Sequence, residues 1–408
     1  MEREGKGMSR RTLLKGLGMG GISSLMLSAE KLARGGKDDR AETTEAPVVP
    51  TRPFGRTGVE VSALSLGGMF DIPNNQLLLR QALKWGVTHW DTADCYGGGR
   101  SEEGIGQFFS KMSDARSRVF LVTKSDRRDP QGMTELLERS LKRMKTDYID
   151  CYFIHGLSDI DEINADTRRW VETEKSKGRI RLFGFSTHRN MERCMMDAAR
   201  LGWIDAIMMS YNFRLMHEQR MKSAVKACVD AGIGLTAMKT QGGGSVRTET
   251  ESELALAGRF IQAGYTDKQA KLKAVWENPH IASICSQMPS LTVLMSNVTA
   301  ATDKKQLTRD EKEVLQRYAR ETAFSYCAGC AERCELAMDE KIPISDVMRS
   351  LMYCHSYGEY ERGRQLFARL PGVSRNQLRR TDFSPAEAIC PQGIPIGRLM
   401  DEAAELFG

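Results

Sequence analysis

From residue 60 onward, short apolar segments alternate with longer amphipathic ones. The short segments have the length and composition of buried strands, and several of the longer ones end at a glycine, as helices commonly do. This alternation is typical of a parallel sheet with crossover helices. The predicted strands cover residues 61–68, 88–94, 118–125, 148–156, 180–188, 205–212, 232–239 and 281–288.

Eight β/α units within roughly 240 residues favour a closed (β/α)8 TIM barrel, an α/β fold, over an open doubly wound sheet. No GxGxxG dinucleotide motif lies between the first predicted strand and its helix. The sequence GRTGVE before that strand predicts a hairpin turn at the bottom of the barrel. Beyond residue 300 the chain alternates helices with loops, which predicts a small helical C-terminal domain over 301–408.

Residues 1–29 have the layout of an export signal, with two arginines, a glycine-rich apolar stretch and a small-residue end. The sequence SRRTLLK, residues 9–15, resembles the twin-arginine pattern. The sequence signal for cleavage after Ala29 is weak. A basic amphipathic tail or a short membrane anchor is the alternative. Residues 30–50 are polar, end in prolines and are interpreted as a linker. We therefore expect recognition by the twin-arginine machinery and a periplasmic or cell-envelope location.

The formal net charge of +6 is concentrated in this leader, because residues 1–40 carry nine Lys/Arg and five Asp/Glu. The remaining chain is almost balanced in charge. This distribution argues against a nucleic-acid-binding surface.

Four polar residues follow three consecutive predicted strands, at the barrel end where such enzymes place their chemistry. A tyrosine works as a general acid or base near neutral pH only if a nearby cation favours its phenolate. A lysine held charged by an aspartate supplies such a cation, and a histidine can then donate to a carbonyl oxygen and orient it. The residues are Asp91 and Tyr96, Lys124, and His155.

The sequence WDTADCYGGGRSEEGIG, residues 90–106, resembles the signature of the aldo/keto reductase family. LVTKSD, DYIDCYFIHG and GFSTH resemble the family's later landmarks in the same order, and the resemblance covers about residues 51–300. It implies a nicotinamide cofactor across the barrel mouth that passes hydride to a carbonyl, while Tyr96 protonates the alkoxide. The reverse reaction, alcohol oxidation, uses the same groups.

The resemblance also implies a set of cofactor contacts, although several residue types depart from the family pattern. Two methionines stand where the family has a glutamine and a stacking aromatic residue, and methionine can still cover a ring. No basic residue follows the eighth strand, so a preference for NADP over NAD is open. The matching positions are Ser186, Thr187, Met208, Met238, Lys239, Ser290 and Asn297.

The ten cysteines fall into two groups. Close spacing in the last quarter of the chain suits metal chelation, whereas the isolated cysteines of the barrel are interpreted as core packing. The first group is Cys327, Cys330, Cys334, Cys354 and Cys390; the second is Cys95, Cys151, Cys194, Cys228 and Cys285.

Iron-sulfur-tailed members of the family carry a ferredoxin-like tail that this region resembles. In two-cluster ferredoxins, the cysteine before proline in one repeat ligates the cluster of the other repeat. CAGCAERC, residues 327–334, keeps three cysteines of a first repeat, and Cys390-Pro391 keeps the last cysteine of a second. We therefore expect one [4Fe-4S] cluster on Cys327, Cys330, Cys334 and Cys390. Zinc on the same thiolates and a metal-free tail are alternatives, and Cys354 is a spare candidate ligand.

Together these patterns predict an NAD(P)-dependent oxidoreductase that reversibly reduces an aldehyde, ketone or sugar, with a redox partner if the cluster carries electrons. Two other functions remain open at this point. One is a non-catalytic nucleotide-sensing or partner-binding barrel. The other is an internal-redox sugar enzyme with a permanently bound nucleotide.

Overall fold

The computed structural model describes residues 48–243, 251–370 and 375–407. The predicted export signal and most of the predicted linker lie outside these residues. Among the described helices, none combines the length and apolarity needed to cross a bilayer.

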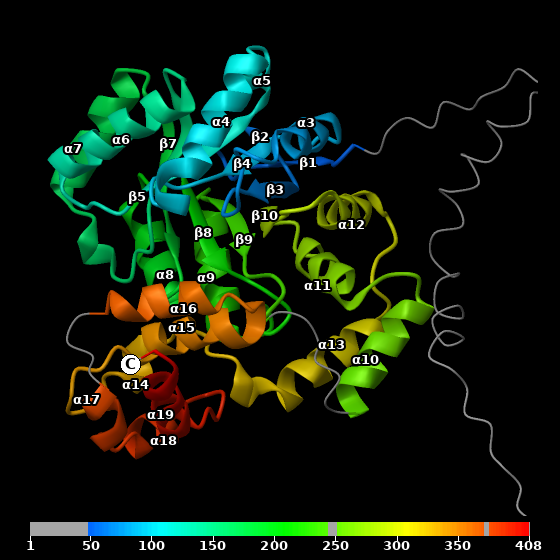
Figure 1. Cartoon of the computed structure of the whole chain (residues 1–408), viewed down its shortest axis with the longest axis vertical. Coiled ribbons are helices and arrows are strands. Elements are labelled where there is room, and N and C mark those ends of the chain that lie inside the picture. Colours follow the sequence, from blue (N-terminus) through cyan, green and yellow to red (C-terminus); the bar gives the residue numbers. More distant parts are fainter. Residues whose placement is uncertain (1–47, 244–250, 371–374, 408) are drawn as a thin grey trace, which may run out of the picture.

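Eight parallel strands close into a barrel in the order β10-β3-β4-β5-β6-β7-β8-β9 (Figure 1). Each of the eight predicted strands forms, so the predicted (β/α)8 barrel is confirmed. The strands are β3 (Leu64–Gly67), β4 (His89–Asp91), β5 (Phe120–Ser125), β6 (Ile149–Ile154), β7 (Ile180–Thr187), β8 (Ala206–Ser210), β9 (Gly234–Met238) and β10 (Ile281–Gln287).

Helices surround the barrel and bury their apolar faces against the outward-facing strand residues. Helix α6 shows how the sequence sets such an element: Asp129 caps its start by accepting from the Gly132 N–H, and Pro130 occupies its first turn. The described barrel helices are α3 (Gln76–Lys84), α4 (Arg100–Lys111), α5 (Ala115–Arg118), α6 (Pro130–Met144), α7 (Ala165–Ser176), α8 (Met191–Leu201), α9 (Gln219–Asp230), α11 (Asp267–Trp276) and α12 (Leu291–Thr302). Helix α10 (Glu251–Gln262) instead packs on α11 and in a separate apolar cluster with Leu315 and Tyr318.

A short hairpin closes the N-terminal end of the barrel, where β1 (Thr51–Pro53) pairs antiparallel with β2 (Glu60–Ser62). Phe54 leaves this hairpin and is only 1% exposed, with its ring edge-on to Phe120 inside the barrel. The next residue, Gly55, has φ +60°, and a Cβ there would lie 2.3 Å from the carbonyl oxygen of Gly232. Only glycine fits this close approach.

The alternation of side chains along β5 places Lys124 inside the barrel. On β5, Phe120 and Val122 belong to the apolar cluster that fills the interior. Because side chains at i, i+2 and i+4 share one face of a strand, Lys124 points to the same interior at the C-terminal end. The register pairs Gly67 with Asp91 on the neighbouring strands β3 and β4.

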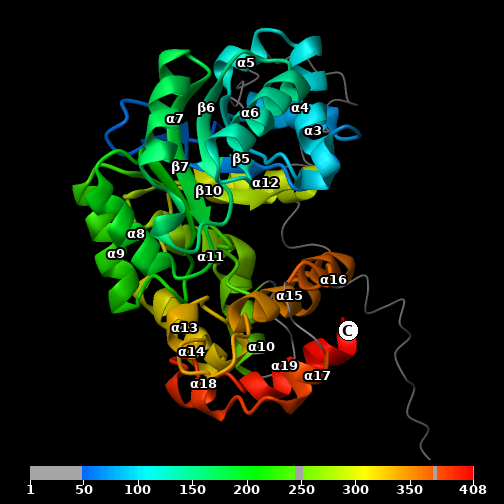
Figure 2. The same ribbon diagram turned by 90° about the vertical axis from the view of Figure 1, so that its left-hand side faces the viewer.

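The C-terminal region is helical and has its own apolar core, formed by residues such as Val347, Leu351 and Met400. Its helices, coloured from yellow to red in Figure 1, lie across one end of the barrel, and the view in Figure 2 agrees. They are α13 (Arg309–Glu321), α14 (Ala331–Cys334), α15 (Ile344–Tyr357), α16 (Tyr360–Ala368), α17 (Arg375–Arg380), α18 (Ser384–Ile389) and α19 (Ile396–Leu406).

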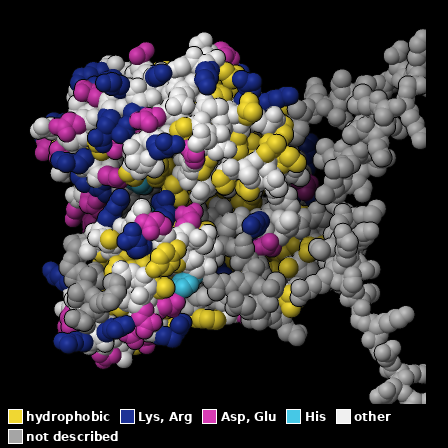
Figure 3. Space-filling view, in the orientation of Figure 1, with side chains coloured by type: hydrophobic (Ala, Val, Ile, Leu, Met, Phe, Trp, Pro, Cys, Tyr) yellow, Lys and Arg dark blue, Asp and Glu magenta, His cyan; other side chains and the backbone are white. Residues whose placement is uncertain are grey.

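Polar contacts join this region to the C-terminal ends of the strands. Arg189, just after β7, pairs with Asp346 at 2.8 Å, and Asn212, just after β8, donates to the Tyr326 hydroxyl at 2.9 Å. On the face drawn in Figure 3, basic and acidic side chains are interspersed over both the barrel and the helical region. The helical region therefore covers the barrel end that carries the predicted active-site residues.

Candidate active site

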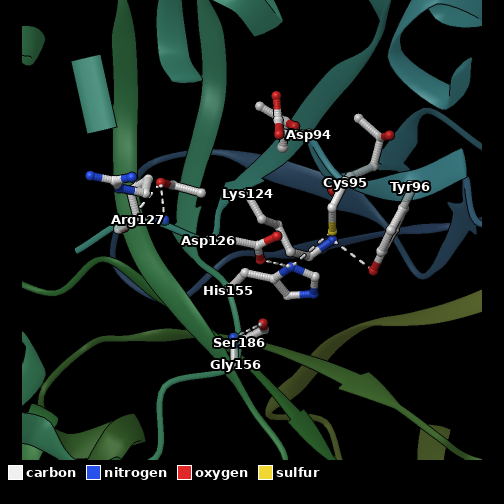
Figure 4. Close-up of polar contacts among 12 residues, drawn as sticks. Asp94, Cys95, Tyr96, Lys124, Asp126, Arg127, His155, Gly156 and Ser186 are labelled. Carbon is white, nitrogen blue, oxygen red and sulfur yellow. Dashed lines mark hydrogen bonds and ion pairs between the residues drawn. The ribbon is translucent and has the colours of Figure 1, made fainter. Parts of the chain in front are cut away.

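Three of the four predicted catalytic residues meet in one hydrogen-bonded group. Figure 4 shows two of them, Lys124 and Tyr96. The ammonium of Lys124, whose side chain is 1% exposed, donates to Asp91 Oδ2 at 2.7 Å and to the Thr92 carbonyl at 2.6 Å. It also donates to the Tyr96 hydroxyl at 3.4 Å. Lys124 thus links the carboxylate of Asp91 to the phenol of Tyr96.

The turn that carries Tyr96 depends on the glycines that follow it. The tyrosine begins a short turn, Tyr96–Gly99, between β4 and α4. Gly99 has φ +101°, and a Cβ there would lie 2.4 Å from the guanidinium carbon of Arg143. Because side-chain-bearing residues rarely adopt this backbone conformation, the glycines permit the sharp return into α4.

The electrostatics keep the phenol protonated. Burial alone would lower the pKa of Lys124, but Asp91, Tyr96 and Cys285 together outweigh burial, so the pKa is raised and the ammonium persists. Burial raises the pKa of Tyr96, and the Lys124 charge offsets only part of that rise. From the sequence we expected the nearby lysine to lower the pKa of Tyr96 toward neutral pH. Burial, which depends on the tertiary structure, instead gives a protonated donor.

His155 lies beside Tyr96, with ring centroids 5.7 Å apart, and its Nδ1 is 2.7 Å from Oδ1 of Asp126. Burial lowers the pKa of His155 more than Asp126 raises it, so the ring is neutral near pH 7. A neutral ring that donates from Nδ1 to a carboxylate carries a lone pair on Nε2. In this state Nε2 is able to accept a hydrogen bond, whereas we expected from the sequence that His155 would donate one to a carbonyl oxygen.

Sequence reasoning missed three residues at this site. Cys95 and Cys285 were interpreted as core packing, but Cys95 lies 3.6 Å from His155 Nδ1 and Cys285 lies 3.7 Å from Asp91 Oδ2. Asp126 was not singled out. The available signals were local: Cys95 directly precedes Tyr96, and Asp126 is two residues beyond Lys124.

The predicted cofactor residues separate into three places. Ser186 and Thr187 end β7, where the Ser186 hydroxyl accepts from the Gly156 N–H at 3.0 Å. Met208 and Met238 belong to the apolar cluster inside the barrel and are 2% and 8% exposed.

The other three predicted cofactor residues lie elsewhere on the barrel rim. Lys239, with φ +56°, donates to the Tyr353 hydroxyl at 2.8 Å. Ser290 caps the start of α12, and Asn297 within α12 donates to the Ser286 hydroxyl at 3.0 Å. Lys239 is therefore turned toward the C-terminal helices, and Ser290 and Asn297 toward the β10–α12 turn.

A cavity of about 400 Å³ lies between the barrel mouth and the C-terminal helices. This volume is within the range of small-molecule sites. The lining carries several cations from both regions. They include Arg189, Arg214, Lys239, Arg349 and Arg398. The carboxylates of Asp346 and Glu402 also line the cavity and pair with three of the arginines, so the charge of the cavity is partly compensated.

The four cysteines predicted as cluster ligands line a second cavity, together with Ile344, Ile394 and Ile396. Among the described residues, no three of these sulfurs lie within 4.8 Å of one another. Burial and the neighbouring thiols raise the pKa of the Cys327 thiol, and burial raises that of Cys334 to about 12. Cys354 instead faces Tyr360, whose carbonyl lies 3.7 Å from its sulfur.

Comparisons with known proteins identify relatives of this chain. The chain is 26% identical to the uncharacterized oxidoreductase YqkF of Bacillus subtilis over 305 residues, which is 67% of this chain and 97% of YqkF. It is 30% identical to the aldo-keto reductase yakc [NADP(+)] of Schizosaccharomyces pombe over 218 residues, 48% of this chain and 62% of yakc.

A solved structure shares the fold. The aldo-keto reductase AKR11C1 from Bacillus halodurans, in its holo form, superposes with a TM-score of 0.56 at 23% identity, covering 66% of this chain and 96% of AKR11C1. The model of the aldo/keto reductase family matches residues 64–293, more than half of the chain. This chain is therefore an oxidoreductase that belongs to the aldo/keto reductase family.

Proposed function

We propose that this protein reversibly reduces an aldehyde, ketone or sugar carbonyl with an NAD(P) cofactor, using Tyr96 as the general acid and base. The observation that carries the proposal is the position of the Lys124 ammonium, which bonds both the Asp91 carboxylate and the Tyr96 hydroxyl. A buried lysine fixed in this way stabilises the phenolate that remains after proton donation.

In the reductive direction, the Tyr96 hydroxyl donates its proton to the oxygen of the substrate carbonyl as negative charge develops there. Lys124 remains charged because of Asp91 and stabilises the resulting phenolate. In the oxidative direction, the Tyr96 phenolate recovers the proton from the substrate hydroxyl, with the His155 ring beside it. A bound nicotinamide would supply or accept the hydride.

None of Asp91, Tyr96, Lys124 and His155 lines the cavity between the barrel and the helical region, so a nicotinamide cofactor held there would have to extend from it to Tyr96. Lys239 and Arg349 line the cavity and would neutralise phosphate charge, and Ser186 lies at the end of the adjacent strand β7. The name of the relative yakc includes NADP(+), which favours NADP over NAD in this proposal. The roles of Thr187, Met208, Met238, Ser290 and Asn297 as cofactor contacts stay predictions.

We further propose one [4Fe-4S] cluster on Cys327, Cys330, Cys334 and Cys390. A single tetrahedral zinc ion with Zn–S bonds of about 2.3 Å would hold its sulfurs about 3.8 Å apart. The wider separation of these thiols around one apolar cavity suits a cluster better than a single ion. The cluster would tie the beginning and end of the helical region together and could pass electrons to a redox partner.

Export through the twin-arginine pathway completes the proposal and rests on residues 1–29, which lie outside the described residues. This pathway moves folded proteins, so a cofactor loaded before export could remain bound. The helical region over the barrel mouth supports such retention. The expected location is the periplasm or cell envelope.

The test is a Tyr96→Phe substitution assayed with NADPH and NADH against a panel of aldehydes, ketones and sugars. Because positioned general acids contribute about 10²- to 10⁴-fold to rates, kcat should fall at least about 100-fold. Tyr148→Phe is the matched control, since Tyr148 precedes β6 at the opposite end of the barrel. If the variant and the wild type turn over equally, Tyr96 is not the acid. If wild type binds nucleotide but reduces nothing, the barrel is a sensing or binding protein.

A further inference from the structure

Three side chains of different chemistry meet at the barrel mouth, beside the Lys124 group. Cys95 follows β4, Asp126 follows β5 and His155 follows β6, so three neighbouring strands each contribute one side chain. One sulfur, one carboxylate oxygen and one imidazole nitrogen lie within 4.8 Å of one another. Figure 4 shows the Cys95 sulfur and the Asp126 carboxylate both directed at the same edge of the His155 ring.

The distances fit a tetrahedral metal ion. A zinc ion with bonds of about 2.3 Å to sulfur and about 2.05 Å to nitrogen separates these two atoms by about 3.5 Å. The Cys95 Sγ to His155 Nδ1 distance is 3.6 Å. The carboxylate is closer, at 2.7 Å from Nδ1, and would have to withdraw by about 0.6 Å. The Asp126 side chain is 50% exposed, so it has room to do so.

We propose that Cys95, Asp126 and His155 form a zinc-binding site with a fourth coordination position open to the barrel mouth. Thiolate, imidazole and carboxylate together select zinc over magnesium or calcium, which prefer oxygen ligands. Three protein ligands with one open position is the arrangement of zinc sites that exchange water or substrate. The site is separate from the four thiols of the helical region.

Zinc binding would change what His155 offers to a substrate. Without the ion, Nδ1–H donates to Asp126 and Nε2 accepts. When Nδ1 binds zinc, the neutral ring carries its hydrogen on Nε2, which then donates. The Cys95 thiol releases one proton to solvent as it becomes a thiolate, while the imidazole proton moves from Nδ1 to Nε2 without net release. This consequence for catalysis rests on the proposed function, but the binding itself does not.

The experiment is a cobalt(II) titration of the full-length protein as purified, because cobalt reports thiolate ligation by a charge-transfer band in the near ultraviolet. Cys95→Ser and Asp126→Asn remove one ligand each. Cys285→Ser is the matched control, a second cysteine at the barrel mouth that lies outside the three-residue group. Zinc competition then gives the affinity for zinc, with no dependence on turnover.

We expect a band in the wild type and in Cys285→Ser that zinc displaces and that Cys95→Ser lacks. Since loss of an outer-shell partner alone costs about 10- to 100-fold in metal affinity, Cys95→Ser should weaken zinc binding by more than about 100-fold. Asp126→Asn, at a half-exposed position, should weaken it while the protein stays folded. An identical band in Cys95→Ser and the wild type would assign the signal to the distal thiols and overturn the proposal, as would zinc affinity unchanged by Asp126→Asn.

Discussion

Lys239, directly after β9, donates a hydrogen bond to the hydroxyl of Tyr353 in α15 at 2.8 Å, across the boundary between the barrel and the helical region. The same ammonium lies 4.4 Å from the centre of the Tyr353 ring. Burial by itself would raise the pKa of Tyr353, but the charges of Lys239 and Arg362 outweigh burial and lower the pKa to about 8. Because this contact lowers the pKa of Tyr353, we expect the docking of the helical region to depend on pH.

The direction of that dependence follows from the lowered pKa. The folded state favours the phenolate, so the stabilisation is complete above the unfolded pKa near 10 and is lost as pH falls through about 8. The difference in unfolding free energy between wild type and Tyr353→Phe should therefore grow from pH 8 to pH 10, by up to about 1.4 kcal/mol per pH unit. Urea unfolding of both proteins at each pH, followed by fluorescence, measures this difference in unfolding free energy. A difference that stays constant with pH would contradict the assignment, and Tyr148→Phe controls for loss of a hydroxyl elsewhere.

Lys124→Met should cost both stability and activity. The substitution leaves the Asp91 carboxylate, 3% exposed, without its counter-charge. Breaking one side of a buried pair typically costs about 3–5 kcal/mol. The double variant Asp91→Asn/Lys124→Met should recover much of the unfolding free energy while kcat stays low. Recovery of kcat in the double variant would mean that the pair acts on structure alone.

Phe54→Ala tests the hairpin that closes the barrel. Because Phe54 is 1% exposed and packs on Phe120, its truncation should lower the unfolding free energy by about 3–5 kcal/mol. Leu77→Ala, at a position 75% exposed, should change it by less than about 0.5 kcal/mol. Denaturant unfolding measures the loss of unfolding free energy in both variants. An equal loss in the two would show that the hairpin does not close the barrel by packing Phe54 inside it.

Cys390→Ser and Cys354→Ser separate the cluster ligands from a nearby thiol. Cys390 lines the cavity with the three earlier cysteines, whereas Cys354 faces Tyr360. Anaerobically purified wild type and Cys354→Ser should contain iron and sulfide and absorb visible light, and Cys390→Ser should lose most of both. Metal analysis and absorption spectra measure this. Zinc without iron in the wild type would favour the mononuclear alternative.

The alternation of apolar and amphipathic segments was enough to predict the barrel, because strand and crossover-helix periods are local properties of the chain. Asp91, Tyr96, Lys124 and His155 could also be found in the sequence, since the barrel topology brings the ends of neighbouring strands together. The meeting of Cys390 with the CAGCAERC cysteines was expected from the resemblance to ferredoxin repeats, and both line one cavity.

Only the tertiary structure decided the contacts that depend on side-chain direction and burial. Asp126 could have faced solvent alone, yet it fixes Nδ1 of His155, and Cys95 approaches the same atom. Tyr353, far along the chain, reaches Lys239 because α15 lies across the barrel mouth. Burial raised the pKa of Tyr96 where the sequence alone favoured a lowered one. The sequence determined which side chains lie at the mouth of the barrel. Long-range packing decided which of these side chains contact one another and how far each is exposed to solvent.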